Sequence, residues 1–180
     1  MIDDFVRRQI RPLLKDNGFG ADHLTYRRPG DGVSQLVCFD HPYGPDTLRV
    51  NAYVAVPALI HYDIRRYGFS PDAKPSRANS HMQTTLGGSP GTIWPMVWQV
   101  DPARVDEIGE QMRQAMTMDV LPWLDALRSE RAVLDAWMSV PWRTWRPASL
   151  EHLIVLLERN GSAADLTEAK AVLSHAAQAK

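Results

Sequence analysis

The chain has 180 residues, of which 44% are hydrophobic and 23% are charged, so it can fold around a core of its own without a metal ion or a disulfide. Its formal net charge of −1 removes the usual electrostatic argument for nucleic-acid binding, and its single cysteine excludes an internal disulfide. There is neither a signal-peptide pattern nor an apolar run long enough to cross a membrane, and we therefore expect a cytoplasmic protein.

The first 56 residues predict one helix followed by three strands. Residues 4–17 have the spacing of an amphipathic helix, in which Pro12 should introduce a kink or a boundary because it lacks the N–H that the helix needs. Strands are expected at residues 23–28, 33–40 and 47–56, and apolar and polar side chains alternate along the last of them. The links between these strands are short, which predicts antiparallel pairing.

The stretch between residues 57 and 100 is predicted to complete the sheet. A short helix is expected at 59–67, followed by an exposed loop at 70–80 that is rich in Pro, Ser, Ala and Asn. Two further strands are expected at 81–86 and 92–100, on either side of a glycine-rich turn at 87–91.

The remaining residues have helical spacing throughout. Asp101, followed by a proline, should cap the first helix, Ser129 the second and Ser149 the third, and Ser162 should open the last one with a capping box. The predicted fold class is α+β: an N-terminal helix, an antiparallel sheet of about four or five strands, and a C-terminal helical region packed on the sheet. We expect one domain, with the helix and sheet in residues 1–100 and the helical part in residues 101–180.

Several motifs that could carry chemistry are weak in this sequence. Residues 87–91 match the pattern G-x-S-x-G, but Pro90 has no N–H for the oxyanion hole of a nucleophile elbow, so a hairpin turn is favoured. Cys38 lies in an apolar run and is interpreted as a small buried hydrophobe. The most metal-like cluster is His61-Tyr62-Asp63, and we expect neither a metal nor a cofactor.

Tryptophan is the one clear excess in the composition, and it is concentrated together with arginine at residues 142–147. Trp and Arg anchor many protein interfaces, so Trp142, Arg143, Trp145 and Arg146 form the candidate partner-binding segment. The alternative, which we favour, is a loop whose indoles cover the core while the arginines stay solvated.

The N-terminal half resembles a bacterial family catalogued as domain of unknown function 4304. The similar segments are Leu-Leu-Lys-Asp-Asn-Gly-Phe at 13–19, Thr-Tyr-Arg-Arg at 25–28, the strand at 36–39, and Arg-Val-Asn-Ala-Tyr-Val at 49–54. The resemblance supports the fold and implies no catalytic residues. Asn51 is the polar residue of interest in it, because strand alternation places it opposite its apolar neighbours, where it could hold a neighbouring strand or face a ligand.

Three functions remain open from the sequence. The leading one is a non-catalytic binding or accessory module, of the immunity type for example, with a protein partner or a second copy of itself. The second is a small-ligand binder or enzyme with a polar pocket on the sheet face around Tyr26, Arg28, Asn51 and His81. The third is a weak nucleic-acid binder, which the net charge disfavours. No catalytic residue is assigned, and a membrane partner is not expected.

Overall fold

The computed structural model describes residues 2–68, 70, 74–86 and 96–178, and these residues fall into two compact units. The first, called the sheet unit below, consists of residues 1–30, 34–55 and 76–126. The second, called the helical unit, consists of residues 31–33, 56–75 and 127–180. Helices and an antiparallel sheet are both present, as the predicted α+β class requires.

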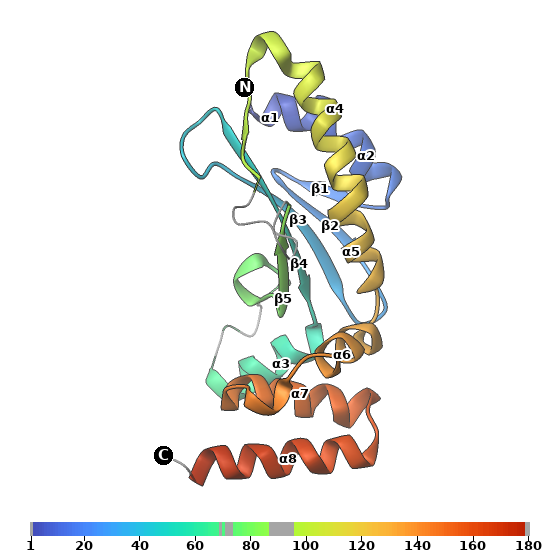
Figure 1. Cartoon of the computed structure of the whole chain (residues 1–180), viewed down its shortest axis with the longest axis vertical. Coiled ribbons are helices and arrows are strands. Elements are labelled where there is room, and N and C mark those ends of the chain that lie inside the picture. Colours follow the sequence, from blue (N-terminus) through green and yellow to red (C-terminus); the bar gives the residue numbers. More distant parts are fainter. Residues whose placement is uncertain (1, 69, 71–73, 87–95, 179–180) are drawn as a thin grey trace. The chain divides into compact units, whose positions relative to one another are not determined.

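The sheet lies within the sheet unit, and every neighbouring pair of its strands is antiparallel (Figure 1). Five strands follow one another in chain order across it, and a short sixth strand pairs with the fourth. They are β1 (Gly20–Asp22), β2 (Thr25–Pro29), β3 (Ser34–Asp40), β4 (Thr47–Ala55), β5 (Met82–Thr85) and β6 (Trp98–Gln99). Of the strand expected at 92–100, β6 is the described part, while residues 92–95 and the turn at 87–91 lie outside the described residues.

The two faces of this sheet differ in character. Residues that pair across neighbouring strands share a face, so Gln35 lies on the same face as Arg28 and Val54. The side-chain amide of Gln35 donates a hydrogen bond to the carbonyl of Leu124 in a helix, and we call this the helix-covered face. The other face carries Asp40 and the residues of the strands that alternate with Gln35 and Val54, and we call it the polar face.

The helices of the sheet unit form two runs, each interrupted by a π-helical segment. The first run consists of α1 (Ile2–Phe5), η1 (Val6–Ile10) and α2 (Arg11–Asp16), and the second of α4 (Val105–Ala115), η4 (Met116–Val120) and α5 (Leu121–Ala126). In both runs the segment after the π-helix has a proline as its second residue, Pro12 or Pro122. A proline inside a helix removes one hydrogen bond and clashes with the preceding turn, and a π-helical segment before it is one way to relieve that clash. The boundary predicted at Pro12 is confirmed.

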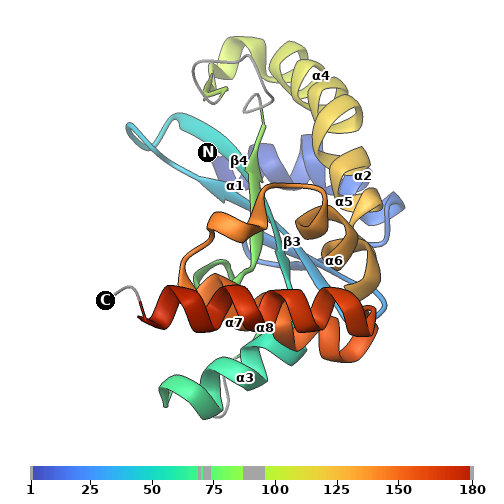
Figure 2. The same cartoon turned by 60° about the horizontal axis from the view of Figure 1, so that its bottom comes forward.

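The helical unit is built around α7 (Pro147–Asn160), which packs against three other helices (Figure 2). These are α3 (Pro57–Tyr67), α6 (Glu130–Met138) and α8 (Ala163–Gln178). Leu150, Leu153 and Leu156 are fully buried, and their spacing of three residues places them on one side of α7. These leucines form the buried side of α7 in this unit.

Most helix caps follow the predictions, with one correction. Asp101 accepts a hydrogen bond from the N–H of Ala103, and Ser129 accepts one from the N–H of Ala132, so both predicted N-caps are confirmed. The cap predicted at Ser149 is wrong, because α7 begins two residues earlier, at Pro147. Proline is favoured in the first helical turn because its φ is already helical and its missing N–H needs no partner there.

Candidate functional site

A polar hollow of about 540 Å³ lies on the polar face of the sheet unit. Strands β3, β4 and β5 supply its floor, and the short 3-10 helix η2 (Arg77–Asn79) contributes one wall. Its lining residues are Asp40, Arg49, Asn51, Tyr53, Arg77, Ala78, Gln83, Thr84 and Thr85. The pocket is therefore lined mainly by polar side chains.

Asp40 is the centre of the hydrogen-bond network in this pocket. Arg77 donates from Nη1 to Oδ1 at 2.8 Å, and Asn51 donates from Nδ2 to Oδ2 at 2.7 Å. Arg49 adds a long contact of 3.4 Å from Nη2 to Oδ2. The hydroxyl of Thr85 in turn donates to Oδ1 of Asn51 at 2.8 Å. Both oxygens of the carboxylate thus have donors from this network.

The pocket offers more donors and more positive charge than its own residues use. Two guanidinium groups, on Arg49 and Arg77, face the single carboxylate of Asp40. The Nε of Arg49 is buried and finds no acceptor among the described residues. Burial, and then the charge of Asp40, raise the pKa of Tyr53, whose hydroxyl is a further donor at the pocket. This excess suits a group that accepts hydrogen bonds and carries negative charge.

Asn51 is the predicted pocket residue that the structure places here, while Tyr26 and Arg28 lie on the other face of the sheet. Tyr26 pairs with Val37, whereas Asn51 pairs with Cys38, the next residue of β3, and successive residues of a strand point to opposite faces. The ring of Tyr26 packs edge-on against Phe39, with the ring centroids 5.8 Å apart. It is a core residue in this fold.

Arg28 is buried in a network of its own on the helix-covered face. Its guanidinium donates to the side-chain oxygen of Gln35 at 2.8 Å and to the carbonyl of Asn17 at 3.1 Å, and it pairs with Asp125 at 2.8 Å. It also lies 4.5 Å from the centre of the Phe19 ring. These contacts connect β2 to the end of α2 and to α5, which is a structural role.

His81 precedes β5 and does not line the pocket. Its backbone N–H donates to the carbonyl of Val54, while Asn51 pairs with Thr85 at the other end of β5. The two positions are four residues apart along the strand, about 13 Å at 3.3 Å per residue. The predicted set of four residues is therefore divided: Asn51 lines the pocket, and the others do not. Arg49 could have been found from strand alternation, but Asp40 depends on the register of β3, and Arg77 comes from η2, which lies in the stretch expected to be a loop.

The tryptophan-rich segment belongs largely to the core of the helical unit. Trp142, in the 3-10 helix η5 (Trp142–Thr144), is only 1% exposed. Trp145 packs edge-on against Trp137 at 5.5 Å between ring centroids. Arg143 stacks over the ring of Trp142 at 4.6 Å and bonds to Glu168. Of the four residues predicted to bind a partner, Arg143, Trp145 and Arg146 are at least partly accessible.

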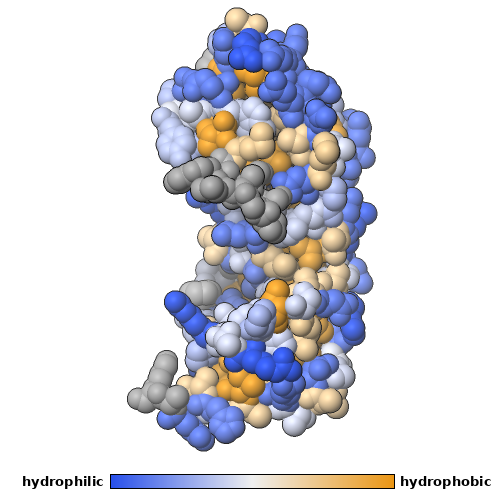
Figure 3. Space-filling model, in the orientation of Figure 1, coloured by the Kyte–Doolittle hydropathy of each residue, from blue (hydrophilic) through white to orange (hydrophobic). Residues whose placement is uncertain are grey.

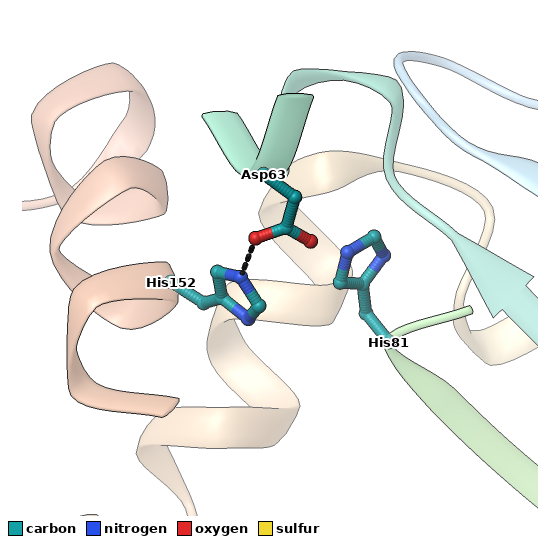
Figure 4. A group of neighbouring side chains, drawn as sticks. All are labelled: Asp63, His81 and His152. Atoms are coloured by element: carbon teal, nitrogen blue, oxygen red, sulfur yellow. Dashed lines mark hydrogen bonds and ion pairs between the residues drawn. The ribbon is translucent and has the colours of Figure 1, made fainter. Parts of the chain in front are cut away.

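A second polar cluster joins α3 to α7 in the helical unit (Figure 4). Nε2 of His152 lies 2.6 Å from Oδ1 of Asp63, and the ring of Tyr62 meets the His152 ring edge-on at 5.9 Å. His61, which the sequence grouped with Asp63, is exposed. His152 was missed because 89 residues separate it from Asp63 and no local motif connects them. Figure 4 also draws His81, which belongs to the sheet unit.

Glu151 extends this cluster along the same two helices. Its Oε2 accepts hydrogen bonds from the hydroxyls of Tyr62 at 2.8 Å and Tyr67 at 2.9 Å, and its Oε1 accepts one from Arg66 at 3.3 Å. Burial acts to raise the pKa of Glu151, but the three hydrogen bonds together outweigh it and lower that pKa. Burial, followed by the hydrogen bond to Glu151, raises the pKa of Tyr62 to about 12.

The surface of the described residues carries no sign of a large apolar docking site on the face drawn in Figure 3, where hydrophobic residues form separate patches among hydrophilic ones. The large hydrophobic side chains that are exposed come from separate segments of the chain: Tyr43, Tyr67, Met96, Met118 and Val140. Among the described helices, none combines the length and the apolar character needed to cross a membrane.

Comparisons of the chain with protein-family models, with curated proteins and with solved structures found no match. The resemblance to the family of unknown function 4304 therefore stays a prediction.

Proposed function

We propose that this chain is a binding protein for a small anionic molecule, which carries a carboxylate or a phosphate and enters the pocket on the polar face of the sheet. The observation that carries the proposal is the buried Nε of Arg49, which has no acceptor among the described residues. A buried donor without an acceptor costs about 1–3 kcal/mol, so a bound acceptor would recover stability that the protein alone lacks.

The charges around the pocket support an anion. Asp40 compensates one of the two guanidinium groups, which leaves about one positive charge over the pocket. Guanidinium groups bind carboxylates and phosphates through two parallel N–H donors. Arg77 has a 61% exposed side chain and can turn towards a ligand, while Arg49, at 32%, stays closer to the strand. Tyr53 and Gln83 add a hydroxyl and an amide beside these charges.

Binding is favoured over catalysis by the groups that surround the pocket hydroxyls. The Thr85 hydroxyl donates to the amide oxygen of Asn51, which is too weak a base to activate a nucleophile. Asp40, the carboxylate of the pocket, is engaged by two arginines and an amide, so it serves as an anchor for these side chains. A protein partner at Arg143, Trp145 and Arg146 and weak nucleic-acid binding both remain predictions.

The test is a calorimetric and thermal-shift titration with inorganic phosphate, succinate and phenyl phosphate, each at constant ionic strength. We expect at least one of these anions to bind with 1:1 stoichiometry and to raise the melting temperature. Arg49→Gln should weaken that binding at least about tenfold, because it removes the parallel N–H donors of the guanidinium group and its positive charge. The matched control is Arg104→Ala, an exposed arginine on the surface of the sheet unit, which should bind as the unaltered protein does.

Two results would overturn the proposal: none of the three anions binds, or Arg49→Gln, with an unchanged circular dichroism spectrum, binds as tightly as before. A single-stranded oligonucleotide that binds with a steep salt dependence, while the small anions do not bind at all, would also contradict it and would favour the nucleic-acid alternative.

A further inference from the structure

We infer that the molecule bound on the polar face is a sugar that carries a phosphate or a carboxylate group. This inference rests on the proposed anion pocket and adds the part of the ligand that does not contact the arginines. It begins with size: a pocket of about 540 Å³ lies within the range of about 300–1,000 Å³ that is typical of small-molecule sites. A phosphate group alone would fill only a part of it, so there is room for a body attached to the anionic group.

The polar groups of the pocket are spread along β4. Arg49, which pairs with Asp40 across the strands, and Tyr53 are four residues apart, about 13 Å at 3.3 Å per residue. Tyr53 in turn stands opposite Gln83 of β5, and both side chains line the pocket. A ligand whose anionic group is held by the arginines therefore needs a body of several bonds to reach Tyr53 and Gln83.

This second end of the pocket has unused hydrogen-bonding capacity. Tyr53 is 8% exposed, yet its hydroxyl has no hydrogen-bond partner among the described residues, and neither has the side-chain amide of Gln83. A phenol hydroxyl both donates and accepts, and an amide offers two N–H donors and an oxygen acceptor. Between the two ends, the Thr85 hydroxyl donates to Asn51, and its oxygen can still accept a hydrogen bond. These groups suit a body that donates and accepts hydrogen bonds.

A hydroxylated body matches this lining better than an alkyl or aryl body does. Among the described lining residues, only Ala78 has a wholly apolar side chain. An alkyl or aryl body would displace water from Tyr53 and Gln83 without replacing the hydrogen bonds of that water, and this weakens binding. The hydroxyl groups of a sugar replace those hydrogen bonds, because each of them is both a donor and an acceptor. The lining therefore favours a sugar over an apolar acid.

Two matched pairs of ligands test the inference by calorimetry at constant ionic strength: glucose 6-phosphate with hexyl phosphate, and glucuronate with hexanoate. The members of each pair have the same anionic group and the same number of carbon atoms, and we call the first member the sugar ligand. In one pair or both, we expect the sugar ligand to bind at least about tenfold more tightly than its alkyl counterpart, since a site that hydrogen-bonds a hydroxyl group rejects the analogue without it.

Variants at the second end of the pocket identify the contact. Tyr53→Phe and Gln83→Ala should each weaken binding of the tighter sugar ligand about fivefold, because each removes a hydrogen bond to the sugar. Both should leave the affinity for inorganic phosphate unchanged, because the arginines that hold the anion are intact. The matched controls are Tyr43→Phe and Gln111→Ala, which alter an exposed tyrosine and an exposed glutamine of the sheet unit outside the pocket lining. Both controls should bind the sugar ligand as the unaltered protein does.

The inference is overturned if neither sugar ligand binds more tightly than its alkyl counterpart. It is also overturned if Tyr53→Phe and Gln83→Ala, with unchanged circular dichroism spectra, both bind the sugar ligand as tightly as before. If inorganic phosphate or succinate then binds in a way that depends on Arg49, the anion pocket stands and only the sugar is wrong. If none of these ligands binds, the proposed function is wrong as well.

Discussion

Arg28 illustrates how a single residue can look functional in the sequence and be structural in the fold. It follows Arg27 at the end of a predicted strand, where a polar side chain could contact a ligand. In the structure it is 3% exposed, and its donors are taken up by Gln35, Asn17 and Asp125. A buried arginine with several acceptors holds the elements around it together, so its loss should lower the free energy of unfolding.

We predict that Arg28→Met lowers the free energy of unfolding by about 2 kcal/mol, because the oxygen of Gln35 is then buried without its donor. We do not expect a larger loss in the free energy of unfolding, because Asp125 is half exposed and water can solvate it after the change. Urea denaturation measures the change. The control is Arg104→Ala, an exposed arginine that should leave the midpoint unaltered. If Arg28→Met instead abolishes anion binding at unchanged stability, the structural role assigned to Arg28 is wrong.

At the same scale, the polar face could be predicted only in part. The alternation of β4 places Arg49, Asn51 and Tyr53 on one face from their spacing alone. The register with β3, which brings Asp40 opposite Arg49, depends on long-range pairing. The pair of Asp63 and His152 could not be found at all, since helix packing and not sequence spacing brings them together.

At the scale of elements, the start of α6 shows how a turn and a helix depend on each other within the helical unit. The segment at residues 31–33 is joined to this helix by backbone hydrogen bonds, from Asp31 to Arg128 and from Glu130 to Asp31. Glu130, the first residue of the helix, is buried and bonds to Arg159 and Asn160. The turn at residues 31–33 therefore does more than reverse the chain: it anchors α6.

Gly32 and Gly68 provide a matched pair for testing this anchor. Both have left-handed backbones, with φ of 68° and 69°, but a Cβ at Gly32 would lie 2.7 Å from Cγ of Glu130, while a Cβ at Gly68 would meet nothing within 4 Å. We predict that Gly68→Ala lowers the free energy of unfolding by about 1 kcal/mol through backbone strain alone. Gly32→Ala should cost about 3 kcal/mol, because the clash is added to the strain.

Chemical denaturation of the two variants measures the difference, and a third variant assigns it. If Glu130 is the cause, Gly32→Ala in a Glu130→Ala background should cost about 1 kcal/mol relative to Glu130→Ala alone, since only the strain remains. Equal costs for Gly32→Ala and Gly68→Ala would show that the side chain of Glu130 moves away freely, and the anchor would then be weaker than its contacts indicate.

At the scale of the whole molecule, Cys38 reports on global unfolding. It is 5% exposed, in the central part of β3, and its neighbours across the sheet are Thr25 and Asn51. Burial raises the pKa of its thiol, an effect that the hydrogen bond with Thr25 only partly opposes. Both the low exposure and the raised pKa reduce the amount of reactive thiolate in the native protein.

We predict that Cys38 reacts with a thiol reagent at pH 8 at least about a hundredfold more slowly in native protein than in urea-unfolded protein, because reaction requires opening of the sheet. The pH dependence has a definite sign. The pKa of Cys38 in the folded protein is above its unfolded value of about 8.5. The contribution of the protonated thiol to the free energy of unfolding is therefore complete below that pH and is lost as the pH rises through the folded pKa. The absorbance of the chromophore that the reagent releases measures the reaction rate, with Cys38→Ser as the blank. Fast reaction in native protein would contradict the burial of the thiol.

The sequence by itself determined many local features of this protein: most of the strands and helices, and the caps at Asp101 and Ser129. These depend on interactions between residues a few positions apart, whose physical chemistry can be read from composition and spacing. Only the tertiary structure decided which polar residues share a site. It separated Arg28 from Asn51, gathered Asp40, Arg49 and Arg77 around a pocket, and joined Asp63 to His152. Those contacts depend on strand register and helix packing, which the burial of apolar side chains selects over the chain as a whole.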